Sequence, residues 1–195
     1  MKLGKPNQRC VTACAHMLLL GALPGFAPPL AAARDVTFLV VSDVHYGIDQ
    51  WGNNEAPNKA GIALMNNLPG TAWPGSGWGI VAMPRGVLVS GDCTDSGTSS
   101  NWAGYWLFGT KDGFRTDYPE RGGSGAKLHY PVYEGYGNHD CLPAHGTDGT
   151  VLTGITTRNN NRATTISKSS NNLHYSWDWD DVHFVNLNLY PGVGG

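Results

Sequence analysis

Three short motifs of acidic, histidine and amide side chains lie along the chain. They are Asp43-Val44-His45, Gly91-Asp92-Cys93-Thr94-Asp95 and Gly137-Asn138-His139-Asp140. Carboxylate, imidazole and amide groups are ligands for Mg, Mn, Fe or Zn ions, and no thiolate is needed. The candidate metal ligands are therefore Asp43, His45, Asp92 and Asn138.

The order of the motifs gives Asp92 a central place. It lies between an Asp/His pair earlier in the chain and an Asn/His pair later in the chain. A carboxylate in that position can bridge two metal ions. Two ions about 3.5–4 Å apart can share a hydroxide, lower its pKa, and hold phosphoryl oxygens while the leaving oxygen departs in line. A two-metal site at these residues could therefore hydrolyse a phosphate ester.

Each motif follows a segment that we predict to be a buried strand. Short segments that we predict to be strands occur at 36–41, 86–90 and 131–135, the first a continuous β-branched run, and helical patterns lie between them at 58–68 and 99–108. This β-α-β-α-β order predicts an α/β fold with a mainly parallel sheet, in which the first strand is buried on both faces. Because ligands gather at the carboxyl ends of such strands, the motifs are expected to form one site. Gly91 and Gly137 are expected to let the backbone turn sharply there.

Taken singly, each motif has an ordinary structural explanation. Asp-x-His can be a turn with a surface histidine, Gly-Asp-x-x-Asp can cap a helix, and Gly-Asn is a common turn. All of them in this order, nearly evenly spaced and each at a strand end, favour the metal site.

On these motifs, residues 36–190 resemble the calcineurin-like metallophosphoesterases. The resemblance implies an α/β/β/α sandwich over residues 34–195. It implies that Asp43, His45 and Asp92 hold a first metal ion, and that Asp92 bridges to a second ion held also by Asn138. It further implies that His139 acts near the leaving group, as proton donor or as a stabiliser of charge, and that Asp95 orients a ligand or His139.

The resemblance is incomplete in the later part of the chain. It implies a Gly-His and a Gly-His-x-His motif, but no Gly-His pair occurs in the sequence. The other histidines have ordinary explanations in loops, in a hairpin or before a strand; they are His129, His145, His174 and His183. We therefore expect a sandwich that is incomplete at the C-terminus, the N-terminal part of a longer enzyme, with a weakly bound second ion.

Residues 1–33 are predicted to be a secretory signal peptide. Basic residues precede an apolar run at 11–23, and Ala31-Ala32-Ala33 supplies a cleavage site. The run is too short to span a bilayer, so no transmembrane anchor is expected and the protein is expected to be periplasmic or secreted. Cleavage removes three of the 13 Lys and Arg residues and none of the 15 acidic ones, so the formal charge falls from −2 to −5. No two basic residues are adjacent in the remainder, which argues against a nucleic-acid surface.

Three further expectations concern structure. Residues 109–127 are predicted to be a polar surface segment and 142–172 a long loop, while 173–177 and 182–187 are predicted to pair as a hairpin. Cys93 and Cys141 directly follow two of the motif positions, and in an exported protein they are hypothesised to form a disulfide across the site.

The function expected from the sequence is metal-dependent hydrolysis of a phosphomonoester or phosphodiester by a dinuclear centre and a metal-bound hydroxide. The ions are expected to be divalent or trivalent, chosen among Mn, Fe, Zn and Mg. The alternative is a catalytically inactive fragment or binding protein of the same fold, using some of the seven Trp residues as contacts.

Overall fold

The structure is a computed structural model, and it describes residues 35–49, 52–53, 55–75, 77–95, 113–141, 149–162 and 165–189. The predicted signal peptide and the predicted helix at 99–108 lie outside these residues. None of the helices in the described segments has the length and apolar character needed to cross a bilayer.

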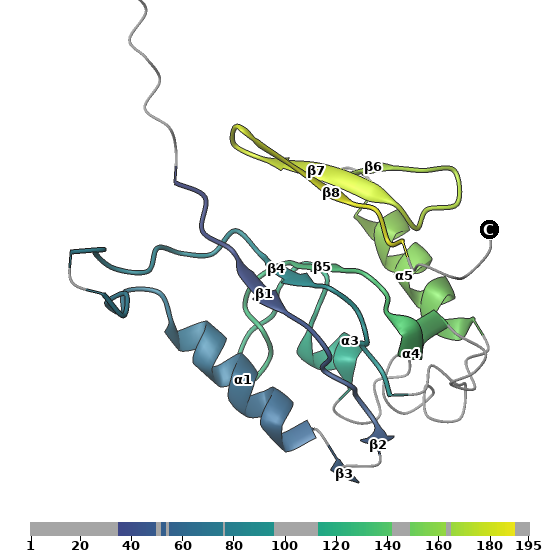
Figure 1. Cartoon of the computed structure of the whole chain (residues 1–195), viewed down its shortest axis with the longest axis horizontal. Coiled ribbons are helices and arrows are strands. Elements are labelled where there is room, and N and C mark those ends of the chain that lie inside the picture. Colours follow the sequence, from purple (N-terminus) through teal and green to yellow (C-terminus); the bar gives the residue numbers. More distant parts are fainter. Residues whose placement is uncertain are drawn as a thin grey trace, which may run out of the picture. The chain divides into compact units, whose positions relative to one another are not determined.

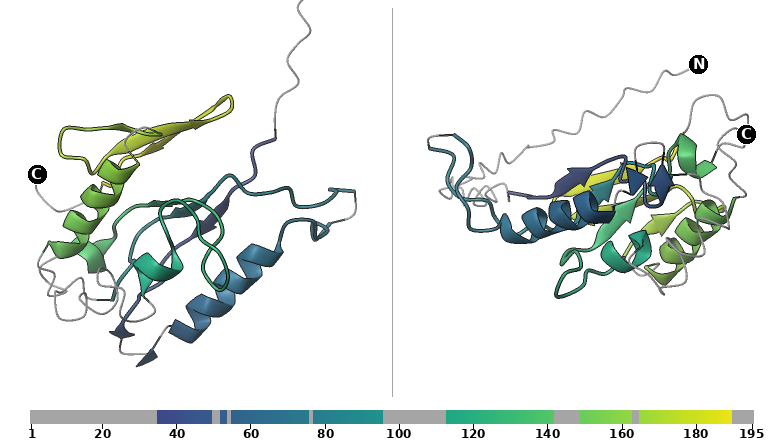
Figure 2. Two further views of the ribbon diagram at one scale, coloured as in Figure 1. Left: turned by 180° about the vertical axis from the view of Figure 1, so that it is seen from behind. Right: turned by 90° about the horizontal axis from the view of Figure 1, so that it is seen from below.

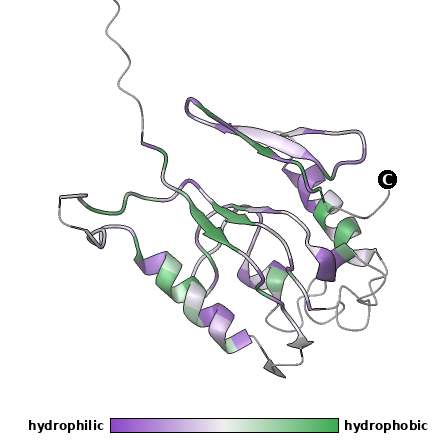
Figure 3. Ribbon diagram, viewed as in Figure 1, coloured by the Kyte–Doolittle hydropathy of each residue, from purple (hydrophilic) through white to green (hydrophobic). Residues whose placement is uncertain are grey.

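A parallel sheet forms the centre of the fold (Figure 1). Its strands are β1 (Leu39–Val41), β4 (Val87–Val89) and β5 (Val132–Glu134), in the order β1-β4-β5. Both pairings are parallel, with Leu39 opposite Val87 and Val87 opposite Val132. The three predicted strands are therefore confirmed, each shorter than its apolar run. Figure 3 shows β1 and β4 as strongly hydrophobic segments.

Burial of the first strand differs from the prediction. Leu39 and Val41 are partly buried and pack against the core, whereas Val40 is 62% exposed. The prediction that β1 is buried on both faces was wrong, because among the described residues the face that carries Val40 borders an open cleft and is left largely uncovered. The central strand β4 fits the expectation better, since Val87 and Val89 are both buried.

Helix α1 (Glu55–Asn67) follows the short pair β2 (Ile48–Asp49) and β3 (Gly52–Asn53), which are antiparallel. The predicted helix begins earlier than expected, because Pro57 lies in its first turn, where a missing N–H is tolerated. It ends before Pro69-Gly70, as expected. Ile62 and Met65 face inward and join the core, while Leu64 is 71% exposed.

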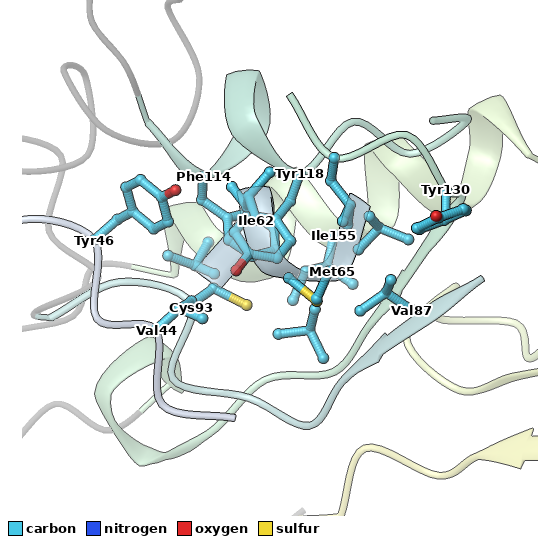
Figure 4. Packing of buried hydrophobic residues seen from close by; sticks show 14 residues of the cluster. Val44, Tyr46, Ile62, Met65, Val87, Cys93, Phe114, Tyr118, Tyr130 and Ile155 are labelled. Atoms are coloured by element: carbon cyan, nitrogen blue, oxygen red, sulfur yellow. The ribbon is translucent and has the colours of Figure 1, made fainter. Parts of the chain in front are cut away.

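The core beside the parallel sheet combines strand valines with side chains from later helices (Figure 4). Phe114 lies in the short helix α3 (Phe114–Asp117), and both it and the adjacent Tyr118 are buried. The prediction of a polar surface segment over 109–127 was therefore wrong for this part. Two large aromatic rings from it fill the core, and burial of such rings is strongly favourable.

The prediction of a long loop over 142–172 was also wrong. This segment contains helix α5 (Thr150–Asn161) and strand β6 (Ser167–Lys168), and both views of Figure 2 show the helix. Threonine, asparagine and glycine are weak helix formers, so local propensity did not indicate α5. The helix is stabilised by tertiary contacts instead. Val151 and Ile155 are fully buried, and Arg158 Nε donates to the buried Glu134 at 3.0 Å.

Strands β6, β7 (Tyr175–Trp179) and β8 (Val182–Asn186) form an antiparallel sheet. It confirms the predicted hairpin, with Trp177 opposite Phe184. Alternate β7 side chains, Tyr175, Trp177 and Trp179, are buried in a second cluster. Trp177 stacks on Tyr133 of β5 at 4.3 Å, so this face of the hairpin packs against the parallel sheet. The fold is thus mixed α/β, with a parallel and an antiparallel sheet.

Candidate metal centre

The three motifs begin just beyond the carboxyl ends of β1, β4 and β5, and backbone hydrogen bonds join the first two. The N–H of Asp43 donates to the Gly91 carbonyl at 3.3 Å, and that of His45 donates to the Asp92 carbonyl at 3.0 Å. The parallel pairing of β1 with β4 therefore continues into the motif loops. This explains how residues far apart in sequence come together, as the strand order predicted.

Two glycines allow the second and third motifs to approach closely. A Cβ on Gly91, whose φ is +136°, would lie 2.6 Å from the Gly137 nitrogen. A Cβ on Gly137 would lie 2.2 Å from Asp92 Oδ1. The sequence predicted that these glycines permit sharp turns; in the structure Gly137 is needed chiefly because the Asp92 carboxylate lies against its backbone.

The backbone is unusual at three of the candidate ligands. Asp43, His45 and Asp92 have φ values of 55°, 43° and 49°. Residues other than glycine rarely adopt this left-handed region, and such conformations are concentrated at functional sites. The hydrogen bonds between the first two motif loops hold the chain in this geometry, and it directs these side chains toward one another.

Asp43, His45 and Asp92 form a cluster with the composition of a metal site. His45 Nε2 lies 3.7 Å from Asp43 Oδ1 and 3.9 Å from Asp92 Oδ2, and one donor atom from each residue lies within 4.8 Å of the others. The Asp43 side chain is 62% exposed, whereas those of His45 and Asp92 are 18% and 11% exposed. An ion here would be reached from solvent on the side of Asp43. The structure thus brings together the residues predicted for the first ion.

A second cluster consists of His45, Asp95 and His139. Asp95 Oδ1 lies 3.6 Å from His45 Nδ1 and 3.9 Å from His139 Nδ1. The two imidazole rings meet edge to face, with centroids 4.5 Å apart. The Nδ1 atom of His139 also contacts the backbone oxygen of Asp95. Asp95 therefore lies beside both histidines, a position from which a carboxylate can orient either ring.

The Asp92 carboxylate faces both the first and the third motif. Its Oδ2 is the atom near His45, while its Oδ1 accepts the backbone N–H of His139 at 2.9 Å. Asn138, the first residue of helix α4 (Asn138–Cys141), lies in the chain between Gly137 and His139 and is half-buried. This arrangement fits a carboxylate shared between two ions, one on each side.

Asp140 is a site residue that the sequence reasoning missed. Its fully buried carboxylate accepts hydrogen bonds from the backbone N–H groups of Cys93, Thr94 and Gly137, at 3.0, 3.1 and 3.1 Å. Thr94 Oγ1 donates to it as well, at 3.1 Å. Burial raises the pKa of Asp140 to about 6, although the backbone donors oppose that shift. Asp140 therefore connects the second motif to the third through these hydrogen bonds. Its position directly after Gly-Asn-His was the available signal.

The hypothesis of a disulfide between Cys93 and Cys141 was wrong, because both are free thiols in the structure. Cys93 is buried below the loop, and its Sγ donates to the Gly135 carbonyl at 3.5 Å. Burial raises the pKa of both thiols, most strongly that of Cys93, so neither has the character of a reactive thiolate.

The other described histidines lie elsewhere. His183 contacts Asp178 at 2.6 Å on the exposed hairpin, His174 contacts the Leu187 carbonyl, and His129 contacts the Gly125 carbonyl at 3.1 Å. None of these three belongs to a metal-capable cluster among the described residues. His145 lies outside those residues.

No protein-family model matches the chain, and no curated protein matches it. The donor set nevertheless fits a metal ion on its own chemistry. Two carboxylates, imidazole nitrogens and a neighbouring amide suit Mn, Fe, Zn or Mg, and the site contains no thiolate that would favour a softer ion.

Proposed function

We propose that the chain is a metal-dependent hydrolase of phosphate esters of the calcineurin-like metallophosphoesterase type, exported to the periplasm or secreted. The single observation that carries this proposal is the position of Asp92, whose two carboxylate oxygens face the first and the third motif. A carboxylate that faces both motifs is placed to bridge two ions, and two-metal sites commonly catalyse phosphoryl transfer.

Asp43, His45 and Asp92 would hold one ion, and Asp92 and Asn138 the other. When bound, the ions supply Lewis-acid activation of water and charge neutralisation at the phosphoryl group. The protein contributes a defined geometry, since the left-handed backbone at these carboxylates and the Gly91–Gly137 contact keep the ligands in place without an ion.

His139 is assigned to the leaving group. An imidazole can donate a proton to the departing oxygen or stabilise the charge that develops on it. Asp95 lies on the Nδ1 side of His139, which leaves Nε2 as the atom for the substrate. Asp95 thus acts by holding the ring and its tautomer, as carboxylates do beside functional histidines.

The proposed fold is the α/β/β/α sandwich. The stacking of Tyr133 on Trp177 supports it, because it packs one face of the parallel sheet against the hairpin. Apolar side chains of both sheets also line a cleft of about 330 Å³ between them, including Val40 and Val185, which are 62% and 56% exposed.

A binding protein of the same fold is the second candidate. It is favoured by Trp73 and Trp78, which are 40% and 75% exposed in a glycine-rich segment. Exposed Trp side chains are common in binding surfaces.

Hydrolysis assays separate the two candidates. The wild-type chain should hydrolyse bis(p-nitrophenyl) phosphate or p-nitrophenyl phosphate when Mn²⁺ or Zn²⁺ is added, and EDTA should stop the reaction. Asp92→Asn should abolish turnover. Asp178→Asn makes the same chemical change on the exposed hairpin, where the side chain is 70% exposed, and should leave turnover unchanged. Turnover that persists in Asp92→Asn would exclude the proposed centre, and a folded wild-type chain without turnover would favour the binding protein.

A further inference from the structure

Tyr46 connects the first and second motifs through its backbone. It directly follows His45, and its N–H donates to the Cys93 carbonyl at 3.0 Å. Its own carbonyl accepts the N–H of Asp95 at 3.1 Å. His45 and Asp95, whose side chains lie 3.6 Å apart, are therefore both attached to the backbone of Tyr46. A shift of this residue would move both of them.

The side chain of Tyr46 is anchored outside the motif loops. The residue is fully buried, and its hydroxyl donates to Asp117 Oδ2 at 2.9 Å. Its ring meets the edges of Phe114 and Tyr118, each with centroids 6.1 Å apart (Figure 4). Asp117 is 4% exposed and belongs to α3, so a helix that contributes no predicted metal ligand fixes the position of Tyr46.

A phenylalanine would fill the same space beside Phe114 and Tyr118, but it would take one hydrogen-bond donor from the buried Asp117 carboxylate. The hydroxyl therefore adds a specific polar contact to the packing of the ring. The hydrogen bond is directional, and in a buried setting it selects one position of the ring. The pair therefore determines where the loop lies more than it contributes to hydrophobic burial.

We propose that Tyr46 and Asp117 are positioning residues for the metal centre, and that their hydrogen bond holds in place His45, a ligand of the first ion, and Asp95, which orients the histidines. They act through the motif backbone and do not contact the ions. The inference rests on the proposed function, since it concerns the same site. Groups that support metal ligands typically contribute 10- to 100-fold to affinity or activity.

The test is Mn²⁺ binding by isothermal titration calorimetry, with thermal unfolding measured separately in EDTA. Tyr46→Phe removes only the hydroxyl and should weaken Mn²⁺ binding by about tenfold. Tyr118→Phe is the matched control, because it removes a hydroxyl from the same aromatic cluster and leaves the Tyr46–Asp117 hydrogen bond in place. It should bind Mn²⁺ like the wild type, even if its unfolding temperature changes.

Asp117 gives an independent pair of variants. Asp117→Asn keeps an oxygen that accepts the tyrosine hydroxyl and should retain wild-type affinity, whereas Asp117→Ala should lose affinity as Tyr46→Phe does. If Asp117→Ala does not fold, the Mn²⁺ affinities of Tyr46→Phe and Asp117→Asn still test the positioning role.

The outcomes separate this inference from the proposed function. Two results would overturn the positioning role: Tyr46→Phe binds Mn²⁺ as tightly as the wild type, or Tyr118→Phe loses as much Mn²⁺ affinity as Tyr46→Phe. If Asp92→Asn still weakens Mn²⁺ binding in either case, the proposed metal centre is unaffected. Both the positioning role and the proposed metal centre would be overturned if the wild type binds no Mn²⁺, or if the Asp92→Asn variant binds Mn²⁺ as tightly as the wild type.

Discussion

Gly137→Ala should disrupt the candidate metal centre by steric contact alone. The new Cβ would lie 2.2 Å from Asp92 Oδ1, 2.6 Å from its Cγ and 2.8 Å from its backbone nitrogen. Real Cβ atoms essentially never come within 3.0 Å of such atoms, so the carboxylate or the loop must move by about 1 Å. Rotation of the side chain does not remove the contact with the Asp92 nitrogen.

Two effects of this substitution can be measured. Forcing a methyl group into a packed position costs typically 1–3 kcal/mol of stability, which urea unfolding in EDTA would report. Displacement of Asp92 should weaken Mn²⁺ binding by about 10- to 100-fold in calorimetry. Both effects have the same cause, so they should appear together.

Gly61→Ala is the matched control. Gly61 lies in α1, and a Cβ there meets nothing within 4 Å. Because alanine is the better helix former by about 1 kcal/mol, this variant should be slightly more stable and should bind Mn²⁺ like the wild type. Wild-type affinity and stability in Gly137→Ala would refute the close approach of Asp92 to the third motif.

Other predictions concern groups around the centre. Glu134→Gln should lower the free energy of unfolding by about 3–5 kcal/mol in urea titrations, because it removes the buried negative charge that both Arg158 and Arg162 contact; a loss below 1 kcal/mol would contradict the ion network. Burial raises the folded-state pKa of Asp140 to about 6 against an ordinary 3.8, so its contribution to stability in EDTA should fall as pH rises from about 4 to about 6. Relative to Asp140→Asn, the wild type should lose about 3 kcal/mol over this range; a difference between the two proteins that does not change with pH, or that changes in the opposite sense, would contradict the raised pKa. In the folded, non-reduced protein a thiol reagent should label Cys141 faster than the buried Cys93, and unfolding should expose both; a chain that resists alkylation after unfolding would restore the disulfide.

The elements that the sequence predicted well are those with strong local patterns. The runs around Val40, Leu88 and Tyr133 are short and apolar and became β1, β4 and β5, and the alternation in Tyr175–Trp179 became β7. Helix α5 could not be predicted in this way, because its Thr- and Asn-rich sequence disfavours a helix and only burial of Val151 and Ile155 stabilises it. The exposure of Val40 likewise depends on what packs over that face of the sheet, and the sequence of β1 does not contain that information.

The candidate site shows the same division. Motif order was enough to predict that the three motif loops meet, because parallel strands bring their carboxyl ends together. It was not enough to find Asp140, whose contacts are with backbone N–H groups that sequence patterns do not represent. The cysteine error has a related cause, since adjacency to a motif does not show whether a side chain points into the site or, like that of Cys93, into the core.

The most direct test of the central claim is to locate bound ions by anomalous X-ray scattering in crystals of the protein grown with Mn²⁺. We expect one peak between Asp43, His45 and Asp92, and a second, weaker peak on the other side of Asp92, toward Asn138. Absence of manganese from both positions at millimolar Mn²⁺, or a peak that does not contact Asp92, would contradict the two-metal centre.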